Sequence, residues 1–325
     1  MASPTSTTFA KATSLQKTSS HTYEANFYDD WCIGSVPHGG YVTAVFLRVA
    51  AAHFNGTLSA QKQPHTITLH LDFLRRTQAG PALFTVQDTK LGRQTSIIHV
   101  SLSQGPESEQ REEVVGYITN SNMATEDGIS SSVAYVPSPE PLPVALAMLA
   151  ADKDENWTRQ AAMPFAGFRK ATQKTEFYFP RKGQMKETST ADEWIRMATG
   201  ERWTNATLGY VSDMWPMPVE TFLVHENNPY DVVSTTTAKP KEPPPAKFWY
   251  PTLLLNLDIK KSLPEEGVEW LFVRVASKQI RNGRMDLEIV ILDEEGDLVA
   301  LSHHVSLVLP ASRNLATRRV GESKI

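Results

Sequence analysis

The 325-residue sequence contains few of the features that mark specialised classes of protein. A single cysteine, Cys32, excludes an intramolecular disulfide and a cysteine-rich zinc site, and it indicates a reducing compartment. No apolar run reaches about eighteen residues, so we expect no membrane span. The net charge of −4 and the pI near 6.2 argue against a nucleic-acid partner. The Gly-x-Ser-x-Gly motif is also missing, so a serine-nucleophile hydrolase is not expected.

The two ends of the chain carry weak signals at most. The first twenty residues are rich in Ser and Thr and lack the apolar segment of a secretory signal, so we expect a flexible tail. The chain ends in Ser323-Lys324-Ile325, which differs from the Ser-Lys-Leu peroxisomal address only in its last residue. A cytoplasmic or peroxisomal protein is therefore expected, and a frayed tail with no targeting role stays an alternative.

The most informative feature is an internal repetition. Hydrophobic residues make up 41% and charged residues 21%, as in ordinary soluble domains, and the length allows two of them. Three short segments of the first half recur in the same order in the second half, which favours one fold unit used twice. The matched segments are Gly40–Ala44 with Gly209–Asp213, Thr66–Phe73 with Thr252–Ile259, and Leu91-Gly92-Arg93 with Asn282-Gly283-Arg284.

The copies differ at a position that matters chemically. Ala44 in the first copy corresponds to Asp213 in the second, whereas Thr66 and Thr252 correspond to each other. A carboxylate in an otherwise apolar helix is costly to bury without a partner, so Asp213 needs a reason to be there. A solvent-facing or capping role near the helix end is the structural alternative.

Each copy reads as one central helix followed by several strands, which indicates an α+β unit with an antiparallel sheet wrapped around the helix. Gly39 and Gly40 open the first helix, where they allow either a ligand oxygen to approach the free N–H groups or tight packing of the helix. The expected first-unit elements are a strand within 21–30, a helix over 41–52, and strands over 66–73, 82–90, 94–102 and 114–119.

The second copy is expected to follow the same plan after a linker. A short helix is predicted between Leu142 and Asn156, and Ala191–Met197 has Trp194 and Ile195 at helix-like spacing. The second central helix is predicted over 204–214, ended by Pro216 and Pro218. Strands are expected over 173–179, 252–259, 269–279, 284–292 and 298–309. The domain boundaries are a tail 1–20, a first unit 21–122, a linker 123–168, a second unit 169–315 and a tail 316–325.

Five pieces, in order, resemble the acyl-CoA thioesterase II family: Gly39-Gly40, Asp72-Phe73-Leu74-Arg75, Tyr210-Val211-Ser212-Asp213, Glu269-Trp270-Leu271 and Gly296–Ala300. The resemblance covers roughly residues 20–122 and 170–312. It implies a double hotdog, in which two antiparallel sheets each wrap a central helix and join edge to edge. It also implies hydrolysis of the thioester between an acyl group and coenzyme A, with no cofactor.

The same resemblance implies a catalytic set that holds a water molecule. By position its aspartate falls on Asp213 and its threonine on Thr252, while the family's glutamine position is occupied by His304. An imidazole can hydrogen-bond to water and can also take a proton. Thr252 as a simple strand former and His304 as a structural histidine are the alternatives, and His303 is expected to face the other side of the strand.

Further residues are candidates for binding the substrate. They are His38, Gly39 and Gly40 before the first helix, and Trp215, which could form a wall of an acyl pocket beside Asp213. His38, His70 and His99 show no metal-ligand spacing, so no metal site is assigned, and Cys32 is expected to be a packed thiol.

Three functions remain open at this point. The first is hydrolysis of acyl thioesters, with acyl-CoA as the expected partner and a homo-oligomer as the expected assembly. The second is a dehydration, a hydration or another acid–base reaction on the same fold, because a histidine beside an aspartate is a common acid–base pair. The third is a catalytically silent acyl-binding protein.

Overall fold

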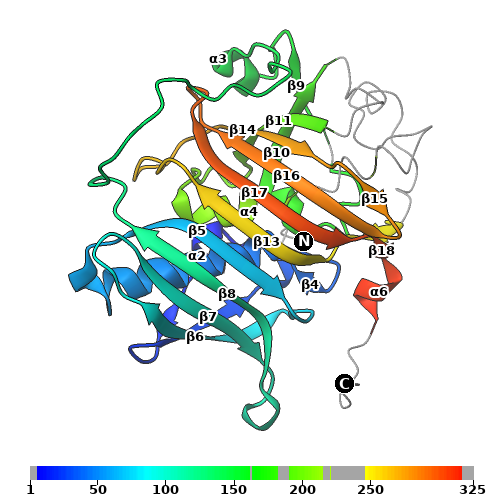
Figure 1. The fold of residues 1–325 in the computed structure, drawn as a ribbon. Helices are drawn as coiled ribbons and strands as arrows, with labels where there is room; N and C mark the ends of the chain where they lie inside the picture. The colour runs from blue at the N-terminus through cyan, green and yellow to red at the C-terminus, as the bar shows by residue number, and fades with distance from the viewer. Residues whose placement is uncertain (1–5, 162, 182–189, 215–219, 221–245, 317–325) are drawn as a thin grey trace.

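The computed structural model describes residues 6–161, 163–181, 190–214, 220 and 246–316. Two units are visible in it, each with a curved antiparallel sheet on one side of a central helix (Figure 1). The two sheets are continuous with each other, which confirms the predicted double hotdog. Among the described residues no helix is long and apolar enough to cross a membrane.

The first unit is built around helix α2, Gly39–Asn55, which is longer than the predicted 41–52 because His38 caps its first turn. Its side chains are buried on almost every side, as expected for a helix inside a curved sheet. The sheet order is β2-β6-β7-β8-β5. These strands are β2 (Thr22–Phe27), β5 (His65–Phe73), β6 (Gly80–Lys90), β7 (Ser96–Gln104) and β8 (Arg111–Ser121).

The second unit repeats this plan in the order β13-β17-β16-β14-β11-β10-β9. The predicted short helix is present as α3, Leu146–Ala150. Strand β9, Trp157–Arg159, pairs with β10 although it lies within the range expected to be a linker. The other strands are β10 (Thr175–Pro180), β11 (Thr190–Met197), β13 (Thr252–Ile259), β14 (Leu271–Ala276), β16 (Arg284–Leu292) and β17 (Leu298–Leu307).

The helix-like interpretation of Ala191–Met197 was wrong, because this segment is strand β11 between β10 and β14. Trp194 packs with Trp270 and Phe272 on the outer face of the sheet, whereas Ile195 joins the main core on the inner face. Apolar residues cover both faces here, so the sequence lacks the alternation by which a half-buried strand is recognised.

The second central helix is also shorter than predicted. Within 204–214 the structure has a 3-10 turn, Asn205–Thr207, followed by helix α4, Leu208–Val211. After this helix the Ser212 hydroxyl donates to the carbonyl oxygen of Gly209, and the Asp213 N–H donates to the carbonyl oxygen of Tyr210. The chain therefore continues in tight turns. Pro216 and Pro218, which were expected to end the helix, lie outside the described residues.

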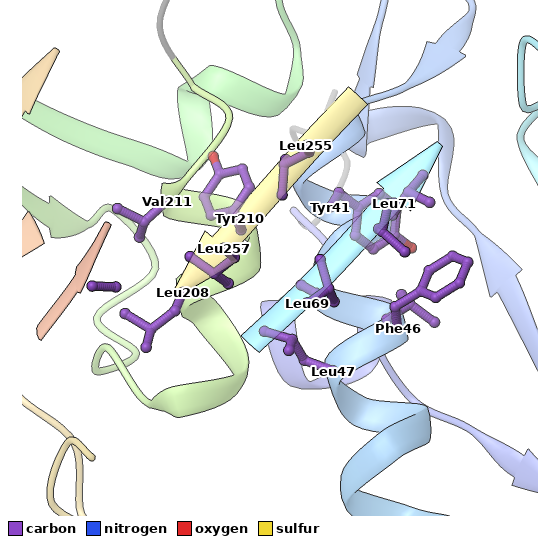
Figure 2. Close-up of a cluster of buried hydrophobic side chains, with 14 of the residues drawn as sticks. Tyr41, Phe46, Leu47, Leu69, Leu71, Leu208, Tyr210, Val211, Leu255 and Leu257 are labelled. Atoms are coloured by element: carbon purple, nitrogen blue, oxygen red, sulfur yellow. The ribbon is translucent and has the colours of Figure 1, made fainter. Parts of the chain in front are cut away.

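The two units join through the repeated strands themselves. β5 and β13 pair antiparallel, with Leu71 opposite Leu255, Leu69 opposite Leu257, and His70 opposite Asn256. His70 and Asn256 are equivalent positions of the two copies, so an approximate two-fold axis passes between them, where His70 Nδ1 lies 2.7 Å from Asn256 Oδ1. Figure 2 shows the leucines of both strands turned toward the two central helices.

The central helices contact each other through glycine. A Cβ on Gly40 would lie 2.6 Å from the carbonyl oxygen of Tyr210, and one on Gly209 would lie 2.6 Å from the backbone nitrogen of Ala44. Only glycine lets two helix backbones approach this closely. Gly40 therefore allows the two helices to pack tightly, and the contact brings the start of α2 next to the end of α4.

Short elements complete the described structure. They are α1 (Phe9–Ala12), β1 (Gln16–Lys17), β3 (Cys32–Ile33), β4 (Val36–Pro37), β12 (Phe248–Trp249), β15 (Ile280–Arg281), β18 (Leu309–Pro310), α6 (Ser312–Leu315) and 3-10 turns at Asp29–Trp31, Ser59–Gln61, Glu107–Glu109 and Ala171–Lys174.

Candidate active site

The structure brings Asp213, Thr252 and His304 together at the end of α4. The Thr252 hydroxyl donates a hydrogen bond to Asp213 Oδ1 over 3.0 Å. His304 Nδ1 lies 3.1 Å from the same oxygen, a contact between charge-bearing groups rather than an aligned hydrogen bond. A turn after α4, the first residue of β13 and the inner face of β17 therefore supply one group each.

A break in the strand register positions Thr252. Thr252 is opposite Ser306 on β17, whereas Leu254 is already opposite Val305, so one residue bulges between them. The first copy has the same irregularity between Thr66 and Thr68 on β5. Bulges re-aim a side chain at the end of a strand. This shared irregularity is part of the duplicated fold, not a feature of the candidate site alone.

The start of α2 faces the Asp213 carboxylate. A Cβ on Gly39 would lie 2.3 Å from Asp213 Oδ2, so any other residue at this position would displace the carboxylate. His38 Nδ1 accepts a hydrogen bond from the N–H of Tyr41, which leaves the proton of a neutral His38 on Nε2, beside the backbone of Asp213. No acceptor is assigned to the N–H groups of Gly39 and Gly40 among the described residues.

His304 is held from behind by a residue that the sequence analysis missed. Ser302 Oγ donates to the carbonyl oxygen of Asn256 over 2.9 Å and lies 2.8 Å from His304 Nε2. Because the only proton of that hydroxyl is used, Nε2 must donate to Ser302 Oγ. An attractive contact between Nδ1 and Asp213 then requires a proton on Nδ1 as well, as in the imidazolium form. Ser302 and His304 are two apart on β17 and therefore share a face, a signal that the sequence already contained.

The electrostatic surroundings keep Asp213 ionised. Burial alone would raise the pKa of its carboxyl, but the contact with His304, the His38 ring and the Thr252 hydroxyl outweigh that effect and lower the pKa below its usual value. Burial also lowers the pKa of His38, against the opposing influence of Asp213. At neutral pH the site therefore presents an ionised Asp213 carboxylate beside the neutral His38 ring.

Asp213 opens onto a cavity of about 260 Å³. Its carboxylate is about 10% exposed, whereas the His304 side chain is fully buried and does not line the cavity. The walls are mostly apolar and aromatic, and Arg75 and Arg76 lie at the cavity as well. The lining includes His38, Gly39, Phe73, Met214, Trp249, Tyr250, Thr252 and Leu287.

The aromatic walls differ in part from those predicted. Trp215, expected to form a wall beside Asp213, lies outside the described residues. Trp249 and Tyr250 line the cavity instead, and their place just before Thr252 could have suggested this. The Tyr250 hydroxyl donates to Glu220, which also pairs with Arg169 over 2.7 Å, so a buried polar network supports one side of the cavity.

Cys32 has no part in this arrangement. It is buried, and burial raises the pKa of its thiol to about 12, so the thiolate needed for nucleophilic attack is not formed at neutral pH. Its sulfur contacts the carbonyl of Tyr28, as expected for a packed thiol.

Comparison with known proteins agrees with the fold. The model of the acyl-CoA thioesterase N-terminal domain matches residues 27–121, and that of the acyl-CoA thioesterase C-terminal domain matches residues 139–308. The thioesterase-like protein TwmA of Talaromyces wortmannii is 36% identical, and the alignment covers 97% of this chain and 96% of that protein.

Solved structures show the same fold at low sequence identity. A hot dog protein of unknown function from Alicyclobacillus acidocaldarius has a TM-score of 0.67 at 15% identity, covering 93% of this chain and 97% of that one. Acyl-CoA thioesterase II TesB2 of Mycobacterium marinum has a TM-score of 0.56 at 16% identity, with the same coverage. The dehydratase domain of RzxB from Pseudomonas fluorescens has a TM-score of 0.50 at 11% identity, covering 89% and 94%, so the fold does not select one reaction.

The two domain models and the full-length relative decide between these chemistries. Both models are thioesterase domains, and together they cover most of the chain in the order of its two units. The TwmA alignment extends over nearly the whole length of both proteins. The chain therefore belongs to the acyl-CoA thioesterase family, and this membership makes it a thioester hydrolase.

Proposed function

We propose that the chain hydrolyses acyl-CoA thioesters with a water molecule that Asp213 and Thr252 hold at the cavity wall. The observation that carries the proposal is the Asp213 carboxylate, which faces the cavity, accepts the Thr252 hydroxyl and lies against the start of α2. The oxygen of Thr252 has lone pairs left for a water proton, because its own proton goes to Asp213.

In the proposed reaction Asp213 accepts a proton as the water attacks the thioester carbonyl carbon. The N–H groups of Gly39 and Gly40 at the start of α2 stabilise the oxyanion that forms. When the C–S bond breaks, the thiolate leaves and takes the proton from Asp213. That transfer is downhill, because a thiol has a pKa of about 8.5 and a carboxyl about 4.

His304 acts on Asp213 in this scheme, not on the substrate. It lies behind the carboxylate and is absent from the cavity wall, and Ser302 fixes the nitrogen that faces Asp213. A proton on its Nδ1 would hold the carboxylate in place and favour its ionised form. We therefore assign His304 a positioning role at the family's glutamine position.

Acyl-CoA is proposed as the substrate on the chemistry of the cavity. The apolar and aromatic walls suit an acyl group. Arg75 is exposed beside the cavity, and within the described part of the chain one of its side-chain nitrogens donates to the carbonyl of Glu112 while no acceptor is assigned to the others. A guanidinium at the rim suits the phosphate groups of coenzyme A.

Neither histidine near Asp213 offers a free base to a bound substrate, which disfavours the dehydration or hydration reaction. His38 lines the cavity, but its Nδ1 already accepts the N–H of Tyr41. Thiol release measured over short, long, branched and aromatic acyl-CoAs tests the proposal, with product masses recorded in parallel. Free thiol plus acid supports it. Loss of water without thiol would replace it with the dehydratase, and tight binding without turnover with a silent acyl-binding protein.

Assembly and location are proposed from the sequence. A homo-oligomer is testable by a sizing measurement. Ser323-Lys324-Ile325 lies outside the described residues, and import of a fluorescent fusion into peroxisomes, lost when these three residues are deleted, tests the targeting role.

A further inference from the structure

A second cluster of chemically capable side chains lies in the first unit, away from the candidate active site. His21 Nε2 is 3.3 Å from Asp88 Oδ2, and His53 Nε2 is 2.9 Å from Asp88 Oδ1. The three donor atoms all lie within 4.8 Å of one another. They come from the segment before β2, the last turn of α2 and strand β6, so the fold brings together residues that are far apart in the sequence.

We propose that His21, His53 and Asp88 form a binding site for a divalent transition-metal ion of the zinc type. Two imidazole nitrogens and one carboxylate, with a fourth position open to water, are a common ligand set for zinc. Donor atoms that share an ion at about 2.1 Å lie at most about 4.2 Å apart, so a small rotation of the partly exposed His21 completes the site.

The groups around the two histidines support this assignment independently. In metal sites the imidazole nitrogen that does not bind the ion donates its proton to a neighbouring acceptor. Here His21 Nδ1 lies 2.8 Å from Ser20 Oγ, and His53 Nδ1 lies 3.1 Å from the Tyr23 hydroxyl. Both hydroxyl oxygens can accept an N–H, so each ring can present an unprotonated Nε2 to an ion.

Metal binding at His53 requires a change of ring tautomer and a rotation of the Tyr23 hydroxyl. Without an ion, neutral His53 donates from Nε2 to Asp88, and Nδ1 accepts the Tyr23 hydroxyl. With an ion at Nε2 the ring proton lies on Nδ1 and points at the Tyr23 oxygen, whose own proton can turn to Thr57. No charge is created on the ring, which suits a side chain that is fully buried.

The local charges favour a cation. Asp88 supplies a partly exposed carboxylate whose two oxygens lie 3.3 Å from His21 Nε2 and 2.9 Å from His53 Nε2. His53 lies in the last turn of α2, where the helix dipole is negative. Lys17, which donates to the Thr57 hydroxyl, is a positive charge that opposes binding.

The sequence could not show this site, because residues 21, 53 and 88 follow no metal-ligand spacing. A bound ion would link the segment before β2 to α2 and β6. An ion that binds only the folded chain raises its melting temperature.

The test is calorimetric titration of zinc into the full-length chain, prepared without a histidine tag and stripped with a chelator. We expect one ion per chain and a higher melting temperature with zinc. His21→Ala and Asp88→Asn, at partly exposed positions, should each weaken binding at least tenfold and remove the thermal shift. His70→Ala is the matched control, because His70 has the same exposure and an aspartate neighbour, Asp72, at 3.4 Å.

Asp213→Asn separates this site from the candidate active site, since it should bind zinc as the unchanged chain does. Wild-type chain that fails to bind zinc stoichiometrically would overturn the proposal. The same holds if His21→Ala and Asp88→Asn bind as tightly as His70→Ala does.

Discussion

The two halves of the molecule share a fold and a threonine, Thr66 or Thr252, but differ at the other two positions of the candidate catalytic set. Thr252 donates to Asp213 in the second half, whereas Thr66 donates to Asn120 in the first, over 2.9 Å. The position of Asp213 is taken by Ala44 in the first half.

The last strand of each unit shows the same contrast. On β17, His304 is opposite Leu255, and on β8 the residue opposite the equivalent Leu69 is Ile118. The first half therefore keeps the threonine and its bulge but places aliphatic side chains where the second half has a carboxylate and an imidazole. The first half shows that the fold forms with aliphatic side chains at these positions, so the fold itself does not require the carboxylate and the imidazole of the second half.

A glycine adds to the contrast, because a residue of the first half makes room for a residue of the second. Gly39 of the first half makes room for the carboxylate of Asp213 in the second. The residue equivalent to Gly39 in the second half is Leu208, and the residue equivalent to Asp213 in the first half is Ala44. One side of the approximate two-fold axis therefore has a glycine and an aspartate, where the other side has a leucine and an alanine.

The largest expected effect follows from removing the carboxylate. Asp213→Asn keeps the shape of the side chain but cannot accept the proton of water, so kcat should fall by about a thousandfold, within the range of general-base catalysis. Thiol release under saturating acyl-CoA measures this, with circular dichroism as a check that the variant is folded. A kcat within threefold of the unchanged chain would show that the base lies elsewhere.

A matched pair of threonine substitutions tests the two halves directly. Thr252→Val removes a hydrogen bond to a carboxylate and a contact for water, which should lower kcat about thirtyfold. Thr66→Val removes an equivalent bond to Asn120 and should leave kcat unchanged, at a cost of about 1 kcal/mol in the free energy of unfolding. Denaturant titration and thiol release are measured on both. Equal kcat values in the pair would contradict the assigned asymmetry.

The glycine at the helix start gives a smaller effect. Gly39→Ala places a methyl group against Asp213 and should lower kcat about tenfold by displacing the carboxylate, because catalysis is sensitive to small misplacements. Gly167→Ala is the control, since a Cβ there meets nothing within 4 Å. If the two variants have the same kcat, the close approach of Gly39 to Asp213 has no catalytic role.

The smallest effect on rate, and a diagnostic one, is expected at His304. His304→Gln restores the family pattern, so kcat at pH 8 should stay within tenfold. The substitution removes the imidazole that lowers the pKa of Asp213, while burial, which raises it, remains. Asp213 then protonates at a higher pH, so the acid limb of the kcat profile should move to higher pH. His303→Gln, on the exposed face, should leave the limb in place, and an unmoved limb in both variants would contradict the positioning role.

The same interactions bear on stability. Because the folded pKa of Asp213 is lowered, its ionised form stabilises the fold above the unfolded pKa, and this stability is lost as the pH falls through the folded pKa.

The sequence predicted the duplicated fold because the segments that begin at Gly40 and Thr66 recur, in the same order, at Gly209 and Thr252. It also indicated Asp213, since a carboxylate in an apolar helix is costly. It could not show that His304 lies behind the carboxylate rather than at the cavity. Strand alternation predicts which face of the sheet a side chain is on, but not how far that side chain lies from the cavity. It also failed at Ala191–Met197, where both faces of the strand are covered.

The metal-binding cluster lay beyond prediction for a related reason. His21, His53 and Asp88 meet only through the curvature of the first sheet around α2, and no local pattern records that contact.

The most direct test of the central claim compares kcat for thiol release between Asp213→Asn and Thr66→Val on the same acyl-CoA. Asp213→Asn changes the partner of Thr252, and Thr66→Val removes the equivalent threonine of the first half, but only Asp213→Asn removes the proposed base. The account predicts that kcat of Asp213→Asn is about a thousandfold below that of Thr66→Val. A ratio near one would contradict the claim that the reacting carboxylate belongs to the second half alone.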